Sequence, residues 1–269
     1  MKVGLIGCGA IGNVIAKAID DGEEELVAVY DLEESRCVQL ADRLRKKPEI
    51  TKSFDEFISK DMNVVIEAAS QQAVREYAER VLDAGKDLMV MSVGAFVDDE
   101  LFERLKEVAK KNGKRIYIPS GAVVGIDALK AVSGIGIEEV VLTTRKHPES
   151  LRGAPFFEKS GISIEEITEP TLLFEGSARE AVKIFPQNVN VAAVISIAGI
   201  GFDRTKVRII ADPTIDRNIH EIKMKGEFGE IVTLAKNVKC PENPKTSYLA
   251  ALSAVRTLRN LSESIIVGT

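Results

Sequence analysis

The chain has 269 residues, of which 45% are hydrophobic and 29% are charged, and its net charge is −5. This length suits two domains, and the acidic balance without a long run of Lys or Arg argues against nucleic acid or an anionic membrane as partner. The longest apolar run, 191–202, is too short and too rich in glycine to span a bilayer. We therefore expect a protein that acts on a small molecule.

The amino-terminal stretch carries the clearest motif. Residues 2–6 predict a buried strand, the glycine turn 7–12 follows at once, and 13–19 predict a helix. This G-x-G-x-x-G pattern between a strand and a helix is typical of dinucleotide binding, although tight turns also use glycines for steric reasons alone. The first glycine permits the turn, the second lets the backbone approach a pyrophosphate, and the third lets the helix pack closely on the strand. The predicted cofactor contacts here are Gly7, Gly9, Ala10, Ile11 and Gly12.

An acid in the expected place accompanies the turn. A second apolar strand, 26–30, ends on Asp31, which lies nineteen residues after Gly12. A carboxylate there accepts hydrogen bonds from an adenosine ribose and repels a 2′-phosphate, which favours NAD over NADP. Arg36 is close enough in the sequence to soften this preference, so NADP stays open.

Strands and helices alternate up to residue 118, which predicts a Rossmann-type doubly wound parallel sheet. The predicted strands are 50–51, 63–69, 88–91 and 115–118, and the predicted helices are 33–44, 53–58, a segment ending at Gly85 and a segment from Asp98 or Asp99 to Gly113. Ligands of such sheets bind beyond the carboxyl ends of the strands. Small residues stand at three of these ends, where they suit a nicotinamide or simply a tight turn, and we predict cofactor contacts at Ala68, Ala69, Ser92 and Ala122.

The pattern changes after residue 125 and predicts a second, α+β domain with a mainly antiparallel sheet. Predicted strands are 139–146, 172–174, 206–211, 218–225 and 230–235, predicted helices are 126–132, 177–184 and 191–197, and 147–159 is a predicted mobile loop or lid. The link 226–229 predicts a hairpin between the last two strands. An apolar open face on this sheet would suit a homodimer contact.

A last helix, starting within 243–247, is expected to pack back on the first domain. The predicted organisation is thus a dinucleotide-binding domain at 1–122, joined by 244–269, and a substrate and dimerisation domain at 123–243. We expect no signal peptide, because the first strand begins at residue 2.

The three cysteines, Cys8, Cys37 and Cys240, suit a reducing cytoplasm and lack the spacing of metal ligands. We therefore predict a cytoplasmic protein and no metal site. Cys8 lies inside the glycine turn, where a small packing residue is favoured over a nucleophile.

Two histidines are the obvious candidates for proton transfer near neutral pH. His147 lies in the predicted loop and is expected to be exposed and inert. His220 shares a strand face with Ile222 and Met224, so it points toward a partly apolar interior. It is either a core histidine bonded to a carbonyl or a general acid and base, and periodicity alone leaves both open.

The sequence resembles the archaeal and bacterial L-aspartate dehydrogenases over nearly its whole length. Only the segment from about 147 to 170 is longer than the family pattern. The resemblance rests on segments in both halves: Gly4-Leu5-Ile6-Gly7, 67–74 (EAASQQAV), Gly94-Ala95-Phe96, Ser120-Gly121-Ala122, 142–146 (LTTRK), 174–178 (FEGSA), 218–222 (NIHEI) and 242–248 (ENPKTSY).

This resemblance implies NAD(P)-dependent oxidation of L-aspartate to iminosuccinate, which can feed NAD synthesis or hydrolyse to oxaloacetate and ammonia. It matches His220 to the family's catalytic histidine, and Ala122 and Asn188 to positions that contact the cofactor. Asn188 would serve equally well as a helix cap. In this interpretation His220 takes a proton from the substrate amine as hydride leaves Cα for the nicotinamide.

A dicarboxylate substrate needs donors to hold it. The candidates are the cations Arg145, Lys146 and Lys245 and the donors Thr246 and Ser247 at the predicted helix start, although these types of residue are also ordinary surface charges and caps. Two other functions stay open. One is a related two-domain reductase that resembles dihydrodipicolinate reductase or homoserine dehydrogenase, and the other is an NAD(H) sensor without turnover.

Overall fold

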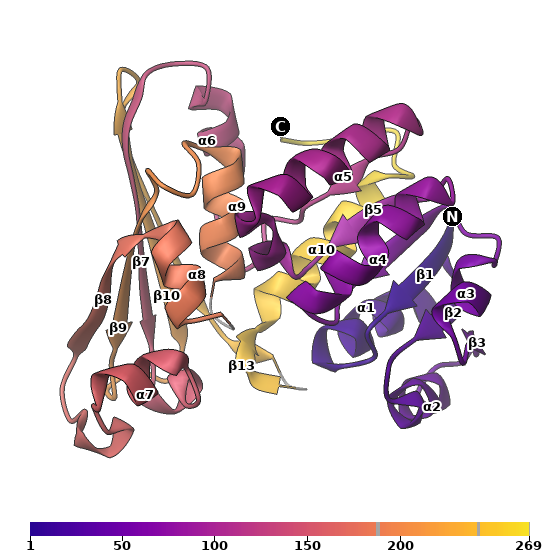
Figure 1. Cartoon of the computed structure of the whole chain (residues 1–269), viewed down its shortest axis with the longest axis horizontal. Coiled ribbons are helices and arrows are strands. Elements are labelled where there is room, and N and C mark those ends of the chain that lie inside the picture. The colour runs from indigo at the N-terminus through magenta and orange to yellow at the C-terminus, as the bar shows by residue number, and fades with distance from the viewer. Residues whose placement is uncertain (187–188, 241–242, 269) are drawn as a thin grey trace. The chain divides into compact units, whose positions relative to one another are not determined.

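The computed structural model describes residues 1–186, 189–240 and 243–268, and for 243–246 it describes the backbone only. The chain forms two compact units. The first contains Met1–Pro119 and Ala251–Ile266, and the second contains Ser120–Ala250 with the end of the chain (Figure 1).

A six-stranded sheet forms the centre of the first unit, and all of its pairings are parallel. Its strands are β1 (Lys2–Ile6), β2 (Glu25–Tyr30), β3 (Glu49–Ile50), β4 (Val64–Glu67), β5 (Asp87–Val90) and β6 (Ile116–Tyr117), in the order β3-β2-β1-β4-β5-β6. The strand order reverses next to β1, because β2 lies on one side of it and β4 on the other. A crevice at this switch point is where doubly wound sheets bind their ligands.

Helices lie on both faces of this sheet, as right-handed crossovers between parallel strands require. They are α1 (Ala10–Asp20), α2 (Glu34–Asp42), α3 (Phe54–Ile58), α4 (Gln71–Asp83), the 3-10 helix η1 (Val93–Val97) and α5 (Asp99–Lys111). Predicted start and stop signals act where expected: Ser53 caps α3, Asp98 caps α5, and Gly85 and Gly113 follow their helices with positive φ.

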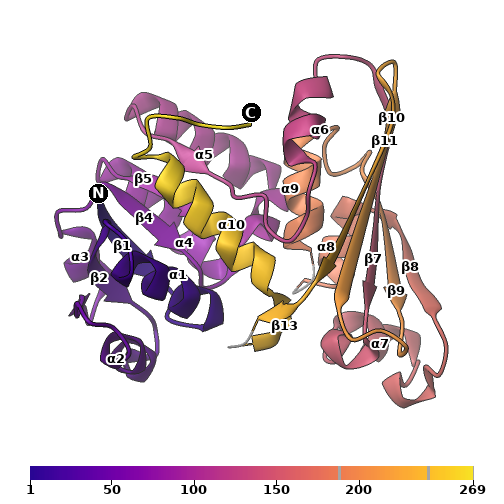
Figure 2. The same ribbon diagram turned by 180° about the vertical axis from the view of Figure 1, so that it is seen from behind.

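The helix α10 (Tyr248–Asn260) completes the core of the first unit. Ala254, Val255 and Leu258 belong to the same buried cluster as Ile15 and Ile19 of α1, and Figure 2 shows the two helices side by side. Residues at the two ends of the chain therefore build one hydrophobic core.

The second unit is built on a five-stranded mixed sheet in the order β11-β10-β7-β9-β8. Its strands are β7 (Ile137–Lys146), β8 (Thr171–Ser177), β9 (Lys206–Ala211), β10 (Asn218–Gly226) and β11 (Gly229–Asn237). Only the β7–β9 pairing is parallel, and Gly226 pairs with Gly229 in the predicted hairpin. The predicted combination of a Rossmann-type domain with a mainly antiparallel second domain is confirmed.

Three helices cover one face of this sheet (Figure 2). They are α6 (Ile126–Val132), α8 (Ala178–Ile184) and α9 (Asn190–Ala198). The strand register places Leu172, Val232 and Leu234 on the opposite face, where each is more than half exposed among charged neighbours.

Two predictions about irregular segments are wrong. The segment 147–159 holds a 3-10 helix, η2 (Pro148–Leu151), and α7 (Pro155–Ser160), and a short η3 (Ile164–Glu166) follows. Apolar contacts hold it in place, because Leu151 is buried and Phe156 stacks on Phe185, the residue after α8, at 5.3 Å between ring centroids. Residues 243–247 do not start the last helix but form β13 (Asn243–Ser247), which pairs with β12 (Lys239–Cys240).

Leu258 and Leu252 of α10 offer a matched test of the core that the two chain ends share. Leu258 is 2% exposed and Leu252 is 41% exposed. Leu258→Ala should lower the free energy of unfolding by about 2–5 kcal/mol, because it leaves a cavity. Leu252→Ala should change it by less than about 0.5 kcal/mol. Equal losses in urea denaturation would show that α10 is not a core element.

Candidate functional site

The turn between β1 and α1 is sterically determined at two of its three glycines. Gly7 has φ +95°, and a Cβ there would lie 2.6 Å from the Ala68 carbonyl oxygen. A Cβ at Gly12 would lie 2.1 Å from the Gly7 carbonyl oxygen. No larger residue fits either place without moving the backbone, so these glycines let β1, β4 and α1 approach one another.

Gly9 differs, because a Cβ at this position would meet no protein atom within 4 Å. Packing therefore does not require glycine here, and the space beside it remains for a ligand. Gly9 is also the N-cap of α1, with no side-chain cap and no acid in the first turn, so the helix presents its N–H groups to this space. Asn13 braces the turn, because its Nδ2 donates to the carbonyl oxygens of Cys8 and Gly9 at 2.8 and 2.9 Å.

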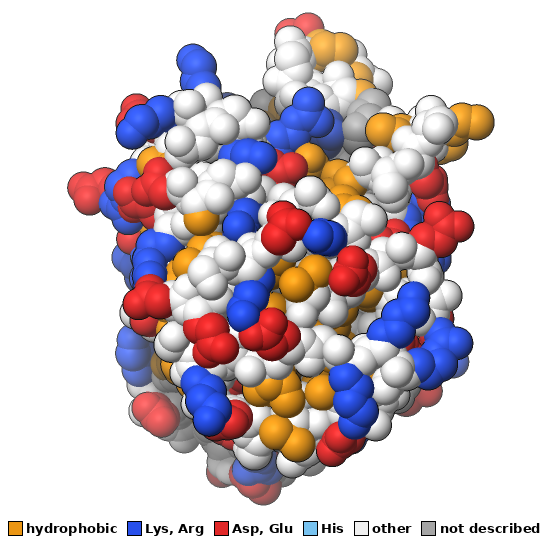
Figure 3. Space-filling model, turned by 90° about the vertical axis from the view of Figure 1, so that its right-hand side faces the viewer, with side chains coloured by type: hydrophobic (Ala, Val, Ile, Leu, Met, Phe, Trp, Pro, Cys, Tyr) orange, Lys and Arg blue, Asp and Glu red, His pale blue; other side chains and the backbone are white. Residues whose placement is uncertain are grey.

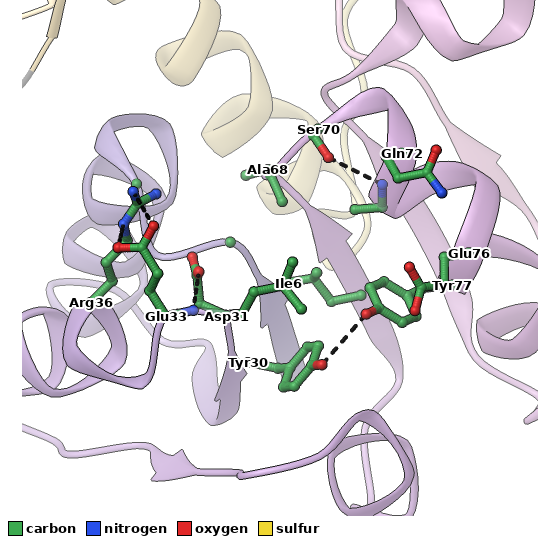
Figure 4. Close-up of a pocket in the computed structure, with 15 residues that line it drawn as sticks. Ile6, Tyr30, Asp31, Glu33, Arg36, Ala68, Ser70, Gln72, Glu76 and Tyr77 are labelled. Atoms are coloured by element: carbon green, nitrogen blue, oxygen red, sulfur yellow. Dashed lines mark hydrogen bonds and ion pairs between the residues drawn. The ribbon is translucent and has the colours of Figure 1, made fainter.

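A pocket of about 280 Å³ opens beside this turn at the switch point of the sheet (Figure 4). Asp31 lies in it, and its carboxylate accepts from the backbone N–H of Cys8 at 2.8 Å and of Glu33 at 3.0 Å. Arg36 also lines the pocket, but it forms a two-pronged ion pair with Glu33 at 2.9 and 2.7 Å. The pocket therefore has a fixed acid, and its one lining arginine is already neutralised.

Glu67, at the end of β4, positions two further predicted cofactor contacts. One carboxylate oxygen accepts from the N–H of Ala69 and Ser70 and from the Ser92 hydroxyl at 2.8–2.9 Å, and the other accepts from the Ser92 N–H at 3.0 Å. Burial raises the pKa of Glu67, and these bonds oppose the rise. The turns after β4 and β5 are thus held together by one carboxylate.

These features fit a dinucleotide. Gly9 and the uncapped start of α1 leave an anion-binding space for a pyrophosphate, Asp31 lies where a ribose binds, and Ala68 and Ala69 line the crevice with small side chains. The structure places the predicted contacts Gly7, Gly9, Asp31, Ala68 and Ala69 in one pocket. Ala10, Ile11 and Gly12 begin the helix that the turn leads into.

In the second unit, a polar cluster interrupts the covered face of the sheet. The register pairs His220 of β10 with Thr144 of β7, and the His220 Nδ1 lies 3.0 Å from the Thr144 Oγ1. Lys146, two residues after Thr144, is on the same face, and all three side chains are buried. His220 is thus bonded to a hydroxyl rather than to a backbone carbonyl.

Burial dominates the titration of both basic groups. Burial, with a smaller contribution from the positive charge of Lys146, lowers the pKa of His220 to about 3. Burial lowers the pKa of Lys146 to about 8. Near neutral pH the imidazole is therefore neutral and able to accept a proton, while the ammonium keeps its charge in an apolar setting.

Two asparagines extend this cluster. Asn218 donates from Nδ2 to the Ser247 Oγ at 3.2 Å, while its buried Oδ1 accepts no hydrogen bond within the described part of the chain. Asn237, its register partner on β11, donates to the carbonyl oxygen of Ala122 at 2.8 Å. The second unit therefore links the predicted site residues Ala122 and Ser247 to the strand that carries His220.

Other predicted residues lie elsewhere. Arg145 is on the opposite face of β7, is partly exposed and forms an ion pair with Asp212 at 3.7 Å. Asn188 and the side chains of Lys245 and Thr246 lie outside the described residues. His147 is half-buried and accepts from the Glu149 N–H at 3.3 Å at the start of η2, so it is a cap rather than a fully exposed side chain.

Reasoning from the sequence missed four supporting residues: Asn13, Glu67, Thr144 and Asn218. Alternation along β7 puts Thr144 on the face of Lys146, and alternation along β10 puts Asn218 on the face of His220. The alternation of residues in the sequence was therefore sufficient to identify both. The bonds of Asn13 and Glu67 depend on turn geometry, which the pattern does not contain.

One face of the molecule shows charges of both signs side by side (Figure 3). On the face drawn in Figure 3, Lys and Arg side chains are interspersed with Asp and Glu. Within the described residues, no group of three or more His, Cys, Asp or Glu is placed to hold a metal ion, and none of the helices described is long and apolar enough to cross a membrane.

The reversed strand order, the glycine turn and the acid after β2 define an NAD(P)-binding protein of the two-domain dehydrogenase class. Residues 7–119 match the family described as homoserine dehydrogenase, NAD binding domain. Residues 127–261 match the family described as aspartate dehydrogenase, C-terminal. The chain belongs to the aspartate dehydrogenase family.

Individual relatives agree over their full lengths. The chain is 52% identical to L-aspartate dehydrogenase of Methanosarcina barkeri, with 100% of both chains covered, and 44% identical to that of Nitrosopumilus maritimus, with 100% of this chain and 99% of the relative covered. Among solved structures it is similar to aspartate dehydrogenase from Thermotoga maritima, with a TM-score of 0.76, 32% identity and coverage of 100% and 99%. The predicted family and cofactor class are thereby confirmed.

Alanine at two glycines should separate ligand binding from folding. Gly9→Ala should leave stability within about 0.5 kcal/mol of wild type, because its Cβ meets no protein atom. It should weaken NADH binding about tenfold, or ~1.4 kcal/mol, by filling the space beside the helix start. Gly12→Ala should instead cost about 1–3 kcal/mol of stability. Fluorescence titration with NADH and urea denaturation measure both effects, and unchanged NADH affinity in Gly9→Ala would contradict the placement.

The buried imidazole should make the protein sensitive to acid. The unfolded chain binds a proton at His220 below about pH 6.5, whereas the folded protein binds it only near pH 3, so stability falls as pH decreases through this range. At pH 5 the loss should be about 2 kcal/mol relative to pH 8. His220→Gln should lack this part of the pH dependence in denaturant titrations, and His147→Gln, the matched histidine control, should keep it. An unaltered profile in His220→Gln would contradict the burial of a neutral imidazole.

Proposed function

We propose that this protein catalyses the NAD(P)-dependent oxidative deamination of L-aspartate to iminosuccinate. The observation that carries the proposal is the likeness to L-aspartate dehydrogenases across both units, at 52% identity over 271 residues in one relative. The matched carboxy-terminal region, 127–261, contains both His220 and Lys146. The segment that resembles aspartate dehydrogenases therefore contains both side chains that we assign to the site.

We infer that His220 is the catalytic acid and base. When the cofactor is bound, its nicotinamide supplies the hydride acceptor. His220 receives a proton from the substrate amine in the oxidative direction and returns it in the reductive direction. Its contact with the Thr144 hydroxyl orients the ring and leaves Nε2 for the substrate.

Charge complementarity indicates how the substrate is held. L-aspartate carries two carboxylates, and a buried ammonium is a strong partner for one of them. We assign this role to Lys146 rather than to Arg145, because Arg145 occupies the opposite face of β7 and pairs with Asp212. The buried Oδ1 of Asn218, which lacks a hydrogen bond within the described residues, is a suitable acceptor for the substrate's ammonium group.

The first unit supports NAD as the preferred cofactor. Asp31 is fixed by two backbone N–H groups, so it cannot turn away from a 2′-phosphate. Arg36, the residue that would favour such a phosphate, is already paired with Glu33. NADP remains the alternative cofactor in this proposal.

We also propose a homodimer in the cytoplasm. The open face of the second sheet carries the exposed side chains of Leu172, Val232 and Leu234, which a second copy would cover. All three cysteines are free thiols, as suits a reducing compartment.

The reaction is tested by following NADH formation with L-aspartate and with other amino acids. Wild-type protein should reduce NAD with L-aspartate, and His220→Gln should lower kcat about 10²–10⁴-fold because the proton acceptor is lost. NADH affinity, measured by fluorescence, should stay within about twofold because the cofactor contacts are unchanged.

His147→Gln is the control and should keep its turnover, because that side chain only caps a short 3-10 helix. Equal turnover by His220→Gln would remove the assignment of the base. No turnover of L-aspartate by wild type with either cofactor would favour a nucleotide sensor or a different substrate.

A further inference from the structure

Two buried thiols meet at the nucleotide-binding turn. Cys8 lies between Gly7 and Gly9, and Cys37 lies on α2. Their sulfur atoms are 3.4 Å apart, although the residues are 29 positions apart in the sequence. Cys8 is 3% exposed and Cys37 is fully buried, and both are free cysteines.

At this distance the two sulfur atoms are in direct contact. A disulfide has a sulfur–sulfur length of about 2.05 Å, so the two atoms need to approach by only ~1.4 Å more. The Cys8 thiol donates to the Cys37 sulfur, which holds the pKa of Cys37 below its ordinary value and raises that of Cys8. Cys37 is therefore the thiol that ionises first, and a thiolate is the reactive form.

We propose that Cys8 and Cys37 are a redox-modification site, at which a small-molecule disulfide reversibly forms a bond between them and thereby weakens NAD(H) binding. In the first step the Cys37 thiolate attacks one sulfur of the oxidant, and one small thiolate leaves. In the second step Cys8 loses its proton and attacks the Cys37 sulfur, and the second small thiolate leaves. Two protein thiols are thus oxidised, and one small disulfide is reduced to two thiols.

The bond would act on the cofactor through the backbone of Cys8. The Cys8 N–H donates to Asp31, and its carbonyl oxygen accepts from Asn13. Drawing Cys8 toward α2 moves these groups and the two glycines that flank them. The same atoms form the pyrophosphate space and hold the ribose acid, so the oxidised turn should bind the dinucleotide less well.

Linkage makes the effect reciprocal. If the disulfide weakens NADH binding by some factor, saturating NADH must disfavour the disulfide by the same factor. Because both sulfurs are buried, the oxidant reaches them only when the turn opens, and a bound dinucleotide would also slow that opening.

The experiment equilibrates the full-length protein with reduced and oxidised glutathione at a series of ratios, with and without saturating NADH. Thiols are trapped by alkylation, and peptide mass spectrometry measures the fraction of the disulfide between Cys8 and Cys37. Fluorescence titration measures NADH affinity in the reduced and oxidised proteins. We expect a Kd about tenfold higher after oxidation, recovery on reduction, and a glutathione midpoint that NADH shifts by the same factor.

Cys37→Ser should bind NADH independently of the glutathione ratio, whereas Cys240→Ser, which removes the thiol of the second unit, should respond like wild type. The proposal is overturned if wild type forms no Cys8–Cys37 disulfide at the most oxidising ratio, or if it forms one while NADH affinity stays unchanged. These readouts do not use aspartate turnover, so their failure is distinct from a failure of the proposed reaction.

Discussion

The first unit depends on how closely β1, β4 and α1 approach one another. At Gly7 and Gly12 a single Cβ would overlap backbone oxygen atoms, so these elements can lie this close only with glycine at both positions. The same closeness leaves an open space beside Gly9, at the positive end of α1. Packing and binding are therefore two consequences of one turn, because protein atoms occupy the space beside Gly7 and Gly12, and the space beside Gly9 remains for a ligand.

Polar side chains around that turn, of which Glu67 is buried and the others are half-buried, limit its movement. Asn13 fixes the loop carbonyls, Asp31 ties the loop to the end of β2, and Glu67 joins the turns after β4 and β5. Each of these side chains is satisfied mainly by backbone N–H or C=O groups, so the cost of burying it is offset by hydrogen bonds. The crevice is consequently preorganised, and ligand binding need not order it.

The sequence was informative where one residue type meets a strict local requirement. The glycine turn, Asp31, the Ser53 and Asp98 caps and the two-residue hairpin each follow from backbone geometry within a few residues, and each is present. It failed at 243–247, where pairing with β12 overrides the helix start suggested by Asn-Pro-Lys-Thr-Ser. It also failed at 147–159, because Phe156 finds its partner Phe185 far along the chain.

The site was predictable to a similar extent. Alternation placed His220 on the covered face of its strand. Its bond to Thr144, a residue 76 positions earlier in the sequence, depends on the register between β7 and β10. The same register shows that Lys146 faces the interior and Arg145 does not. From the sequence alone, Arg145 and Lys146 are equal candidates for binding a substrate carboxylate, and only the pairing of the strands distinguishes them.

The burial of His220 and Lys146 together has a consequence for the proposed reaction. An imidazole with a pKa near 3 is a weak base, and the neighbouring ammonium is one of the two causes of that low pKa. A dicarboxylate bound at Lys146 would neutralise that ammonium and add negative charge close to the ring, and both effects raise the pKa of His220 toward the range in which it accepts protons efficiently. A substrate lacking the second carboxylate would leave the pKa low. The selectivity for aspartate would then arise in the proton-transfer step as well as in binding, because the bound substrate itself raises the pKa of the catalytic imidazole.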